Sequence, residues 1–150
     1  MDLFHSTPFG IYALFATGLC ALLLGIDGAS GGARVKSKLV VNPEDSSTVA
    51  KGADFSETEA AAVARVMRAH RNATANIIPF LIVMLLYVAL GATSTWVLAL
   101  CGVFAFARVV HAFAYIGAKQ PFRTLSFVIG QLCTLVAAIQ VVRAALGIVM

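Results

Sequence analysis

Three stretches of this chain carry basic and polar side chains inside otherwise apolar sequence, at spacings that put each set on one face of an α-helix. The sets are Arg68, Asn72 and Asn76; Arg108, His111 and Tyr115; and Arg123, Thr124, Phe127 and Gln131. They combine guanidinium, imidazole, amide, phenol and hydroxyl groups without a carboxylate. A cavity lined by all three would therefore prefer an anion, in particular one whose carboxylates arginine can bind through two hydrogen bonds.

The surrounding sequence predicts that these sets lie in a membrane. Of 150 residues, 60% are apolar and only 11 are basic and 7 acidic, whereas about a quarter of the residues of a soluble domain are charged. A bilayer core of about 30 Å needs about 20 apolar residues per helix. We predict a single domain over 1–150, an all-α integral membrane four-helix bundle with spans at about 8–26, 57–90, 95–117 and 124–149.

The basic residues predict the orientation of these spans. Seven of the eleven lie between positions 34 and 71, and two more lie between the third and fourth spans. The positive-inside rule then places the polar loop 28–55 and the hinge 117–123 in the cytoplasm, with both termini outside. All three polar sets fall in the cytoplasmic half of the bundle. At the start of the second span, Ser56 and Glu59 have the spacing of a capping box.

Charge, cysteine spacing and loop length indicate which partners and which membrane to expect. The net charge of +4 is not accompanied by the interleaved basic and aromatic residues of a nucleic-acid site, so we expect membrane lipid and no nucleic acid as partner. Three cysteines in separate apolar runs lack the paired spacing of a zinc site, and we predict no metal. Short loops favour a bacterial inner membrane, with the endoplasmic reticulum as the alternative.

Four motifs resemble one known family, the membrane-associated proteins in eicosanoid and glutathione metabolism (MAPEG). The most specific is Arg65-Val66-Met67-Arg68-Ala69-His70-Arg71-Asn72, which continues to Asn76 and Pro79-Phe80. The others are Asn42-Pro43-Glu44-Asp45, the Ala107-Arg108, His111 and Ala114-Tyr115 series, and Pro121-Phe122-Arg123-Thr124-Leu125-Ser126-Phe127. Their order and spacing cover most of the chain.

The resemblance implies a homotrimer of four-span protomers that binds glutathione, as co-substrate, between neighbouring subunits near the cytoplasmic face. It also implies a glutathione transferase that attacks hydrophobic electrophiles, with lipid hydroperoxide reduction as an accompanying activity. Carried over position by position, the family's glutathione contacts fall on Arg34, Arg68, Arg71, Asn72, His111, Tyr115, Arg123, Thr124 and Gln131.

A thiol with a reference pKa of about 8.5 is mostly protonated at neutral pH, although the thiolate is the nucleophile. We expect the charge of Arg123 and the hydroxyl of Thr124 to stabilise that anion, aided by the positive end of the helix that starts there. Asp45 is a further catalytic candidate for handling a proton or the substrate. Its alternative role is structural, as the capping residue of a turn.

Two positions keep alternatives open. Ala75 stands where the family usually has a glutamate, which favours a non-catalytic member that binds fatty acids. Phe127 matches the transferases rather than the prostaglandin-E-synthase-like isomerases, so the isomerase is a second alternative.

Nearer the outer end of the fourth span, we interpret Gln140 as an interhelical hydrogen-bonding residue and Arg143 as an interfacial anchor.

Overall fold

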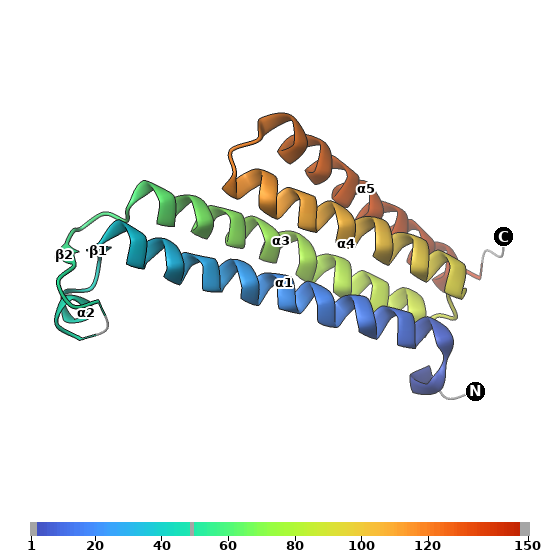
Figure 1. Ribbon diagram of the computed structural model, residues 1–150. Helices are drawn as coiled ribbons and strands as arrows, with labels where there is room; N and C mark the ends of the chain where they lie inside the picture. The colour runs from blue at the N-terminus through green and yellow to red at the C-terminus, as the bar shows by residue number, and fades with distance from the viewer. Residues whose placement is uncertain (1–2, 49, 148–150) are drawn as a thin grey trace.

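The computed structural model describes residues 3–48 and 50–147, and four long helices running side by side make up most of it (Figure 1). The helices are α1 (Thr7–Ser37), α3 (Ala61–Ala89), α4 (Ser94–Ile116) and α5 (Gln120–Ala145). A short 3-10 helix, η1 (Leu3–His5), precedes them. Each of the four is long and apolar enough to cross a membrane. The predicted all-α, multi-pass integral membrane fold is confirmed.

Helix α1 extends eleven residues beyond the predicted end of the first span at position 26, through the segment predicted as the start of a loop. The Ser6 hydroxyl caps its first turn by accepting a hydrogen bond from the Phe9 amide at 3.4 Å. The glycines at 28–32 do not end it, because glycine lowers helix propensity without forbidding a helix. At 1.5 Å per residue, its 31 residues span about 46 Å, so its end projects beyond a hydrocarbon core of about 30 Å.

The connection between α1 and α3 is partly ordered. Strands β1 (Leu39–Val40) and β2 (Asp54–Phe55) pair in parallel around the short helix α2 (Pro43–Ser47). The predicted capping box is wrong, because α3 begins only at Ala61. The Ser56 hydroxyl accepts a hydrogen bond from the Thr58 amide at 3.2 Å, and so closes a local turn instead.

Helix α5 begins at Gln120, four residues before the predicted start of the fourth span. Pro121 fits this first turn, because a helix start has no use for the amide hydrogen that proline lacks. The predicted end of that span at 148–149 lies outside the described residues. The earlier start places Arg123 and Thr124 past the first free amides of the helix, which weakens the expected contribution of its positive end.

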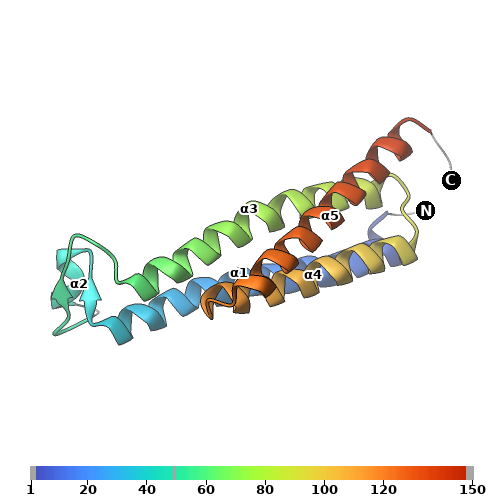
Figure 2. The same ribbon diagram turned by 90° about the horizontal axis from the view of Figure 1, so that it is seen from above.

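The helices pack in an order that fixes the later sites. Helix α4 packs against α5, and α1 against α3, with α3 and α4 also in contact. The core centres on the stacked rings of Phe80 and Phe104, whose centroids are 3.6 Å apart. Figure 2 shows α5 running obliquely, from beside the end of α4 toward the end of α3. Helix α5 therefore borders α4 at one end of the bundle and α3 at the other.

Candidate active site

A small cavity lies where α3 faces the end of α4 and the start of α5. Its volume is about 220 Å³. Its walls are formed by one residue of α3, two of α4 and three of α5. These residues are Asn72, His111, Tyr115, Arg123, Thr124 and Phe127. Five of the six residues are among the predicted catalytic or glutathione-binding residues, and the sixth, Phe127, belongs to the predicted polar face of the last span.

His111 on α4 contacts the backbone of α5 beside this cavity. The imidazole is 3% exposed, and its Nδ1 lies 3.0 Å from the backbone oxygen of Arg123. Ser126 Oγ lies 3.4 Å from the same nitrogen. The other ring nitrogen, Nε2, is buried without a hydrogen-bond partner in the described part of the chain. His111 thus positions the backbone of Arg123 and leaves one buried polar atom unpaired.

Arg123 carries the positive charge of the cavity. Its guanidinium carbon lies 4.9 Å from the centroid of the Tyr115 ring, within cation–π range. It forms no ion pair with a carboxylate among residues 3–48 and 50–147. Across the cavity, Asn72 Oδ1 is buried with no hydrogen bond within the described chain. The cavity therefore offers an uncompensated cation and an unused acceptor, which suits an anionic ligand that also has a donor.

Arg108 lies behind the cavity wall. It is 2% exposed, and its Nη2 donates to the carbonyl oxygens of Ser126 and Phe127 at 3.1 and 3.3 Å. Its Nε and Nη1 have no partner in the described residues. The guanidinium lies directly against Gly130, where a side chain would collide with it. Sequence periodicity placed Arg108 on the polar face of α4, but nothing in it indicated the roles of Ser126 and Gly130.

The other predicted ligands lie around the cavity rather than in it. Gln131 donates from Nε2 to Asn76 Oδ1 at 2.6 Å, so its amide links α5 to α3. Arg68 and Arg71 are exposed on α3. Ala75, at the position of the missing glutamate, is also exposed. None of these residues borders the 220 Å³ cavity within one protomer.

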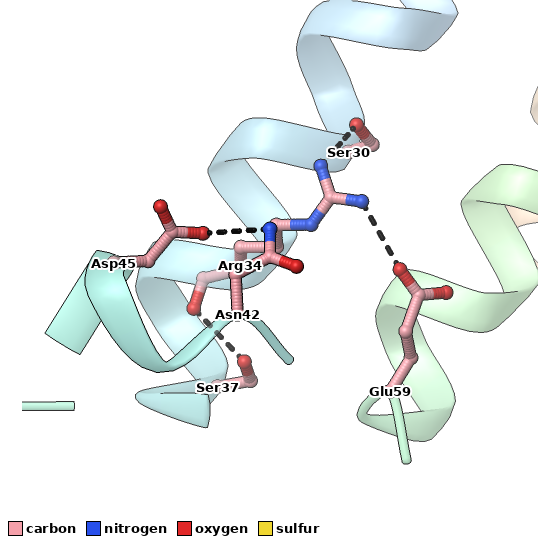
Figure 3. Close-up of polar contacts among 6 residues, drawn as sticks. All are labelled: Ser30, Arg34, Ser37, Asn42, Asp45 and Glu59. Carbon is pink, nitrogen blue, oxygen red and sulfur yellow. Dashed lines mark hydrogen bonds and ion pairs between the residues drawn. The ribbon is translucent and has the colours of Figure 1, made fainter. Parts of the chain in front are cut away.

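Arg34 lies near the end of α1, and Asp45 lies in α2, which follows it. This part of the chain extends beyond the α4–α5 turn (Figure 1). Arg34 is on α1, not in a loop, and its Nη2 forms an ion pair with Glu59 at 3.0 Å (Figure 3). Asp45 Oδ2 accepts a hydrogen bond from the Asn42 amide at 3.2 Å within the α2 turn. Within a single protomer, the structure does not bring either residue to Arg123.

The sequence profile of the MAPEG family matches residues 12–143 of the chain. The protein belongs to the MAPEG family. Microsomal glutathione S-transferase 1 of Rattus norvegicus is 34% identical over 139 residues, which cover 90% of this chain and 89% of that protein. The Homo sapiens protein of the same name is 34% identical over 142 residues, 92% and 91% of the two chains. Prostaglandin E synthase of Macaca fascicularis is 34% identical over 145 residues, 91% and 93%.

Family membership confirms the resemblance that the motifs carried. The match covers all four long helices in part or whole, including every residue that lines the Arg123 cavity. Because this MAPEG chain is 34% identical both to a transferase and to a synthase, identity alone does not choose between these two activities.

Proposed function

We propose that this MAPEG protein is a membrane-bound glutathione transferase that uses glutathione as its co-substrate. The observation that carries the proposal is the convergence of Arg123, Tyr115, His111 and Asn72 on one cavity where no described carboxylate neutralises the arginine. Glutathione is an anion with carboxylates, amide donors and a thiol, and it matches this set of groups. The similarity to microsomal glutathione S-transferase 1 supports the same chemistry.

The size of the cavity supports a shared site in a homotrimer. Small-molecule sites typically have volumes of about 300–1,000 Å³, whereas this cavity measures about 220 Å³. One protomer therefore supplies only part of the walls. We propose that a neighbouring copy completes the site, with Arg34, Arg68 and Arg71 as further contacts for the carboxylates. Their exposure leaves them accessible to a ligand held between subunits.

The proposed reaction begins with ionisation of the glutathione thiol. The proton passes to water, and the Arg123 charge and the Thr124 hydroxyl stabilise the sulfur anion. The thiolate then attacks an electrophilic carbon, a carbon–sulfur bond forms, and the leaving group departs with its electron pair. With 1-chloro-2,4-dinitrobenzene, the leaving group is chloride. This scheme assigns no proton transfer to Asp45, whose carboxylate is engaged in the α2 turn.

An apolar groove supports a hydrophobic second substrate. It measures about 430 Å³ and lies between α4 and α5. Phe122, Leu125 and Ser126 line it on α5, immediately beside Arg123 and Thr124 in sequence. An electrophile dissolved in the lipid can lie here next to the turn that carries the proposed thiolate-stabilising groups. Aromatic electrophiles lose a leaving group when the thiolate attacks, whereas a reactive alkene adds the thiolate and then takes a proton from water. A lipid hydroperoxide is instead attacked at oxygen and leaves as the alcohol after protonation by water, and a second glutathione converts the resulting sulfenic acid into disulfide and water.

The test is turnover of glutathione with chlorodinitrobenzene by the purified protein in detergent or nanodiscs, followed by the absorbance of the conjugate. Conjugate formation that saturates with glutathione is the expected result. Prostaglandin E formation at a higher kcat/KM would favour the isomerase, which the macaque relative makes the second candidate. Binding of fatty acids without turnover of any electrophile would contradict the proposal and favour an accessory protein.

Replacing Arg34 by alanine is expected to raise the KM for glutathione at least about tenfold with little change in kcat, because one charged contact is worth about 1.5–3 kcal/mol. The matched control is Glu59→Gln, which removes the ion-pair partner of Arg34 but keeps the guanidinium (Figure 3). We expect this control to leave KM unchanged or lower. Equal increases of KM in both variants would show that Arg34 acts only through its bond to Glu59.

We also propose that the end of the bundle carrying α2 faces the cytoplasm. The start of α1 and the end of α5 lie together at the opposite end (Figure 1), as the distribution of basic residues predicts. In a bacterial inner membrane, alkaline phosphatase fused after position 150 is expected to be active, because it folds only outside the cytoplasm. Phosphatase inserted in the 41–55 connection is expected to be inactive, and the reverse pattern would overturn this orientation. The bacterial membrane itself stays the prediction made from the sequence.

A further inference from the structure

A second polar cavity lies at the opposite end of the bundle from Arg123. It measures about 440 Å³ and is bounded by the α3–α4 turn and the end of α5. Its polar lining consists of Tyr87, Thr93, Trp96, Gln140 and Arg143. Neither the proposed reaction nor the family motifs use these residues.

Gln140 is the strongest indication that this cavity binds a ligand. The sequence predicted that its amide bonds to another helix, and no such bond forms within the described protomer. The side chain lines the cavity and is only 8% exposed, yet it has no hydrogen-bond partner among the described residues. The amide atoms are not among the fully buried polar atoms, so the small exposed part of this side chain faces the cavity. A ligand there would give a hydrogen-bond partner to a group that the protein leaves unpaired.

Two further features favour an anion in the same place. Arg143 lines the cavity and forms no ion pair within the described chain. Helix α4 starts here, and the side chain of its N-cap residue, Thr93, makes no capping hydrogen bond. The first amides of this 23-residue helix therefore remain available at its positive end. An arginine, an amide and a helix start together suit a phosphate group.

The ligand should also carry a cation or a hydrogen-bond donor. Helices α3 and α5 both end here, and the negative ends of helices favour a cation or a hydrogen-bond donor. Trp96 and Tyr87 are of the residue types that concentrate at the level of lipid headgroups. We propose that this cavity binds the headgroup of phosphatidylethanolamine, with the phosphate at Arg143, Gln140 and the start of α4. The ammonium then faces the ends of α3 and α5.

Native mass spectrometry of the intact protein tests this site, using phosphatidylethanolamine and phosphatidylcholine with identical acyl chains. Wild type is expected to retain the ethanolamine lipid in preference, because choline has no donor. Arg143→Gln is expected to retain it about tenfold less, which corresponds to about 1.4 kcal/mol. The control, Arg65→Gln, removes an arginine from the other end of the bundle and should behave as wild type. Equal retention by Arg143→Gln and wild type, or of the two lipids by wild type, would overturn the proposal.

A second variant, Gln140→Leu, tests the site if Arg143→Gln fails to fold. Competition with inorganic phosphate distinguishes a lipid headgroup from a free anion. In lipid-free detergent, Gln140→Leu should be at least as stable as wild type, since it removes an unpaired amide. Added phosphatidylethanolamine should raise the Tm of wild type but not of this variant. Excess inorganic phosphate should leave the wild-type lipid adduct in place. An equal rise of Tm in the variant, or displacement of the lipid by phosphate, would contradict a headgroup site.

Discussion

Arg123→Leu is expected to lower kcat/KM for conjugation about 100-fold, which corresponds to about 2.7 kcal/mol. The loss follows from the thiol, because without the guanidinium charge most bound glutathione stays protonated at neutral pH. The contacts of Arg123 hold both its backbone and its guanidinium in position at the cavity. His111 holds its backbone oxygen at 3.0 Å, and Tyr115 supports its guanidinium at 4.9 Å. We expect glutathione still to bind weakly through the remaining arginines.

The direct measurement is the ultraviolet absorbance of the thiolate formed when glutathione binds. Wild type should show it at neutral pH, and Arg123→Leu should show it only at a pH where free glutathione also ionises. Arg65→Leu is the matched control, since it removes the same charge from α3 outside the cavity. Thiolate absorbance that is unchanged in Arg123→Leu would remove this residue from the proposed role.

The main elements of the site could be predicted because helical periodicity is a local property. A spacing of three or four residues determines which side chains share a face before any packing is known. Asn72, His111, Tyr115 and Arg123 each belonged to a predicted polar face, and the structure brings those faces to one cavity. The three faces can meet only if they lie in the same half of the bundle, and the membrane topology predicted from the basic residues places them there.

The parts that could not be predicted depend on contacts between distant positions. The Arg34–Glu59 ion pair joins residues 25 positions apart. The helical course of 28–37 contradicts what its glycines suggest, because glycine lowers helix propensity without forbidding a helix. The partner of Gln140 could not be predicted either, since the side chain has none among the described residues of this protomer and instead lines a cavity.

Gly130→Ala is expected to lower the free energy of unfolding by about 1–3 kcal/mol, the usual cost of overpacking. A β-carbon at this position would lie 2.9 Å from the guanidinium carbon and from Nε of Arg108. Arg108 is 2% exposed and holds two carbonyl oxygens of the preceding turn of α5, so it has little room to move. The added methyl group must therefore break those bonds or displace α5 from α4.

Thermal unfolding in detergent measures this effect, and Gly25→Ala in α1 is the control. A β-carbon at Gly25 meets no atom within 4 Å, and alanine in a helix interior is about 0.5–1 kcal/mol more favourable than glycine. The control should thus be as stable as wild type or more so, and equal stability of Gly130→Ala would show that Arg108 can repack. The carbonyls that Arg108 holds belong to Ser126 and Phe127, the next turn after Arg123. A displaced α5 should consequently also lower conjugation activity in Gly130→Ala, although the nearest atoms to the added methyl group all belong to Arg108, which does not line the Arg123 cavity.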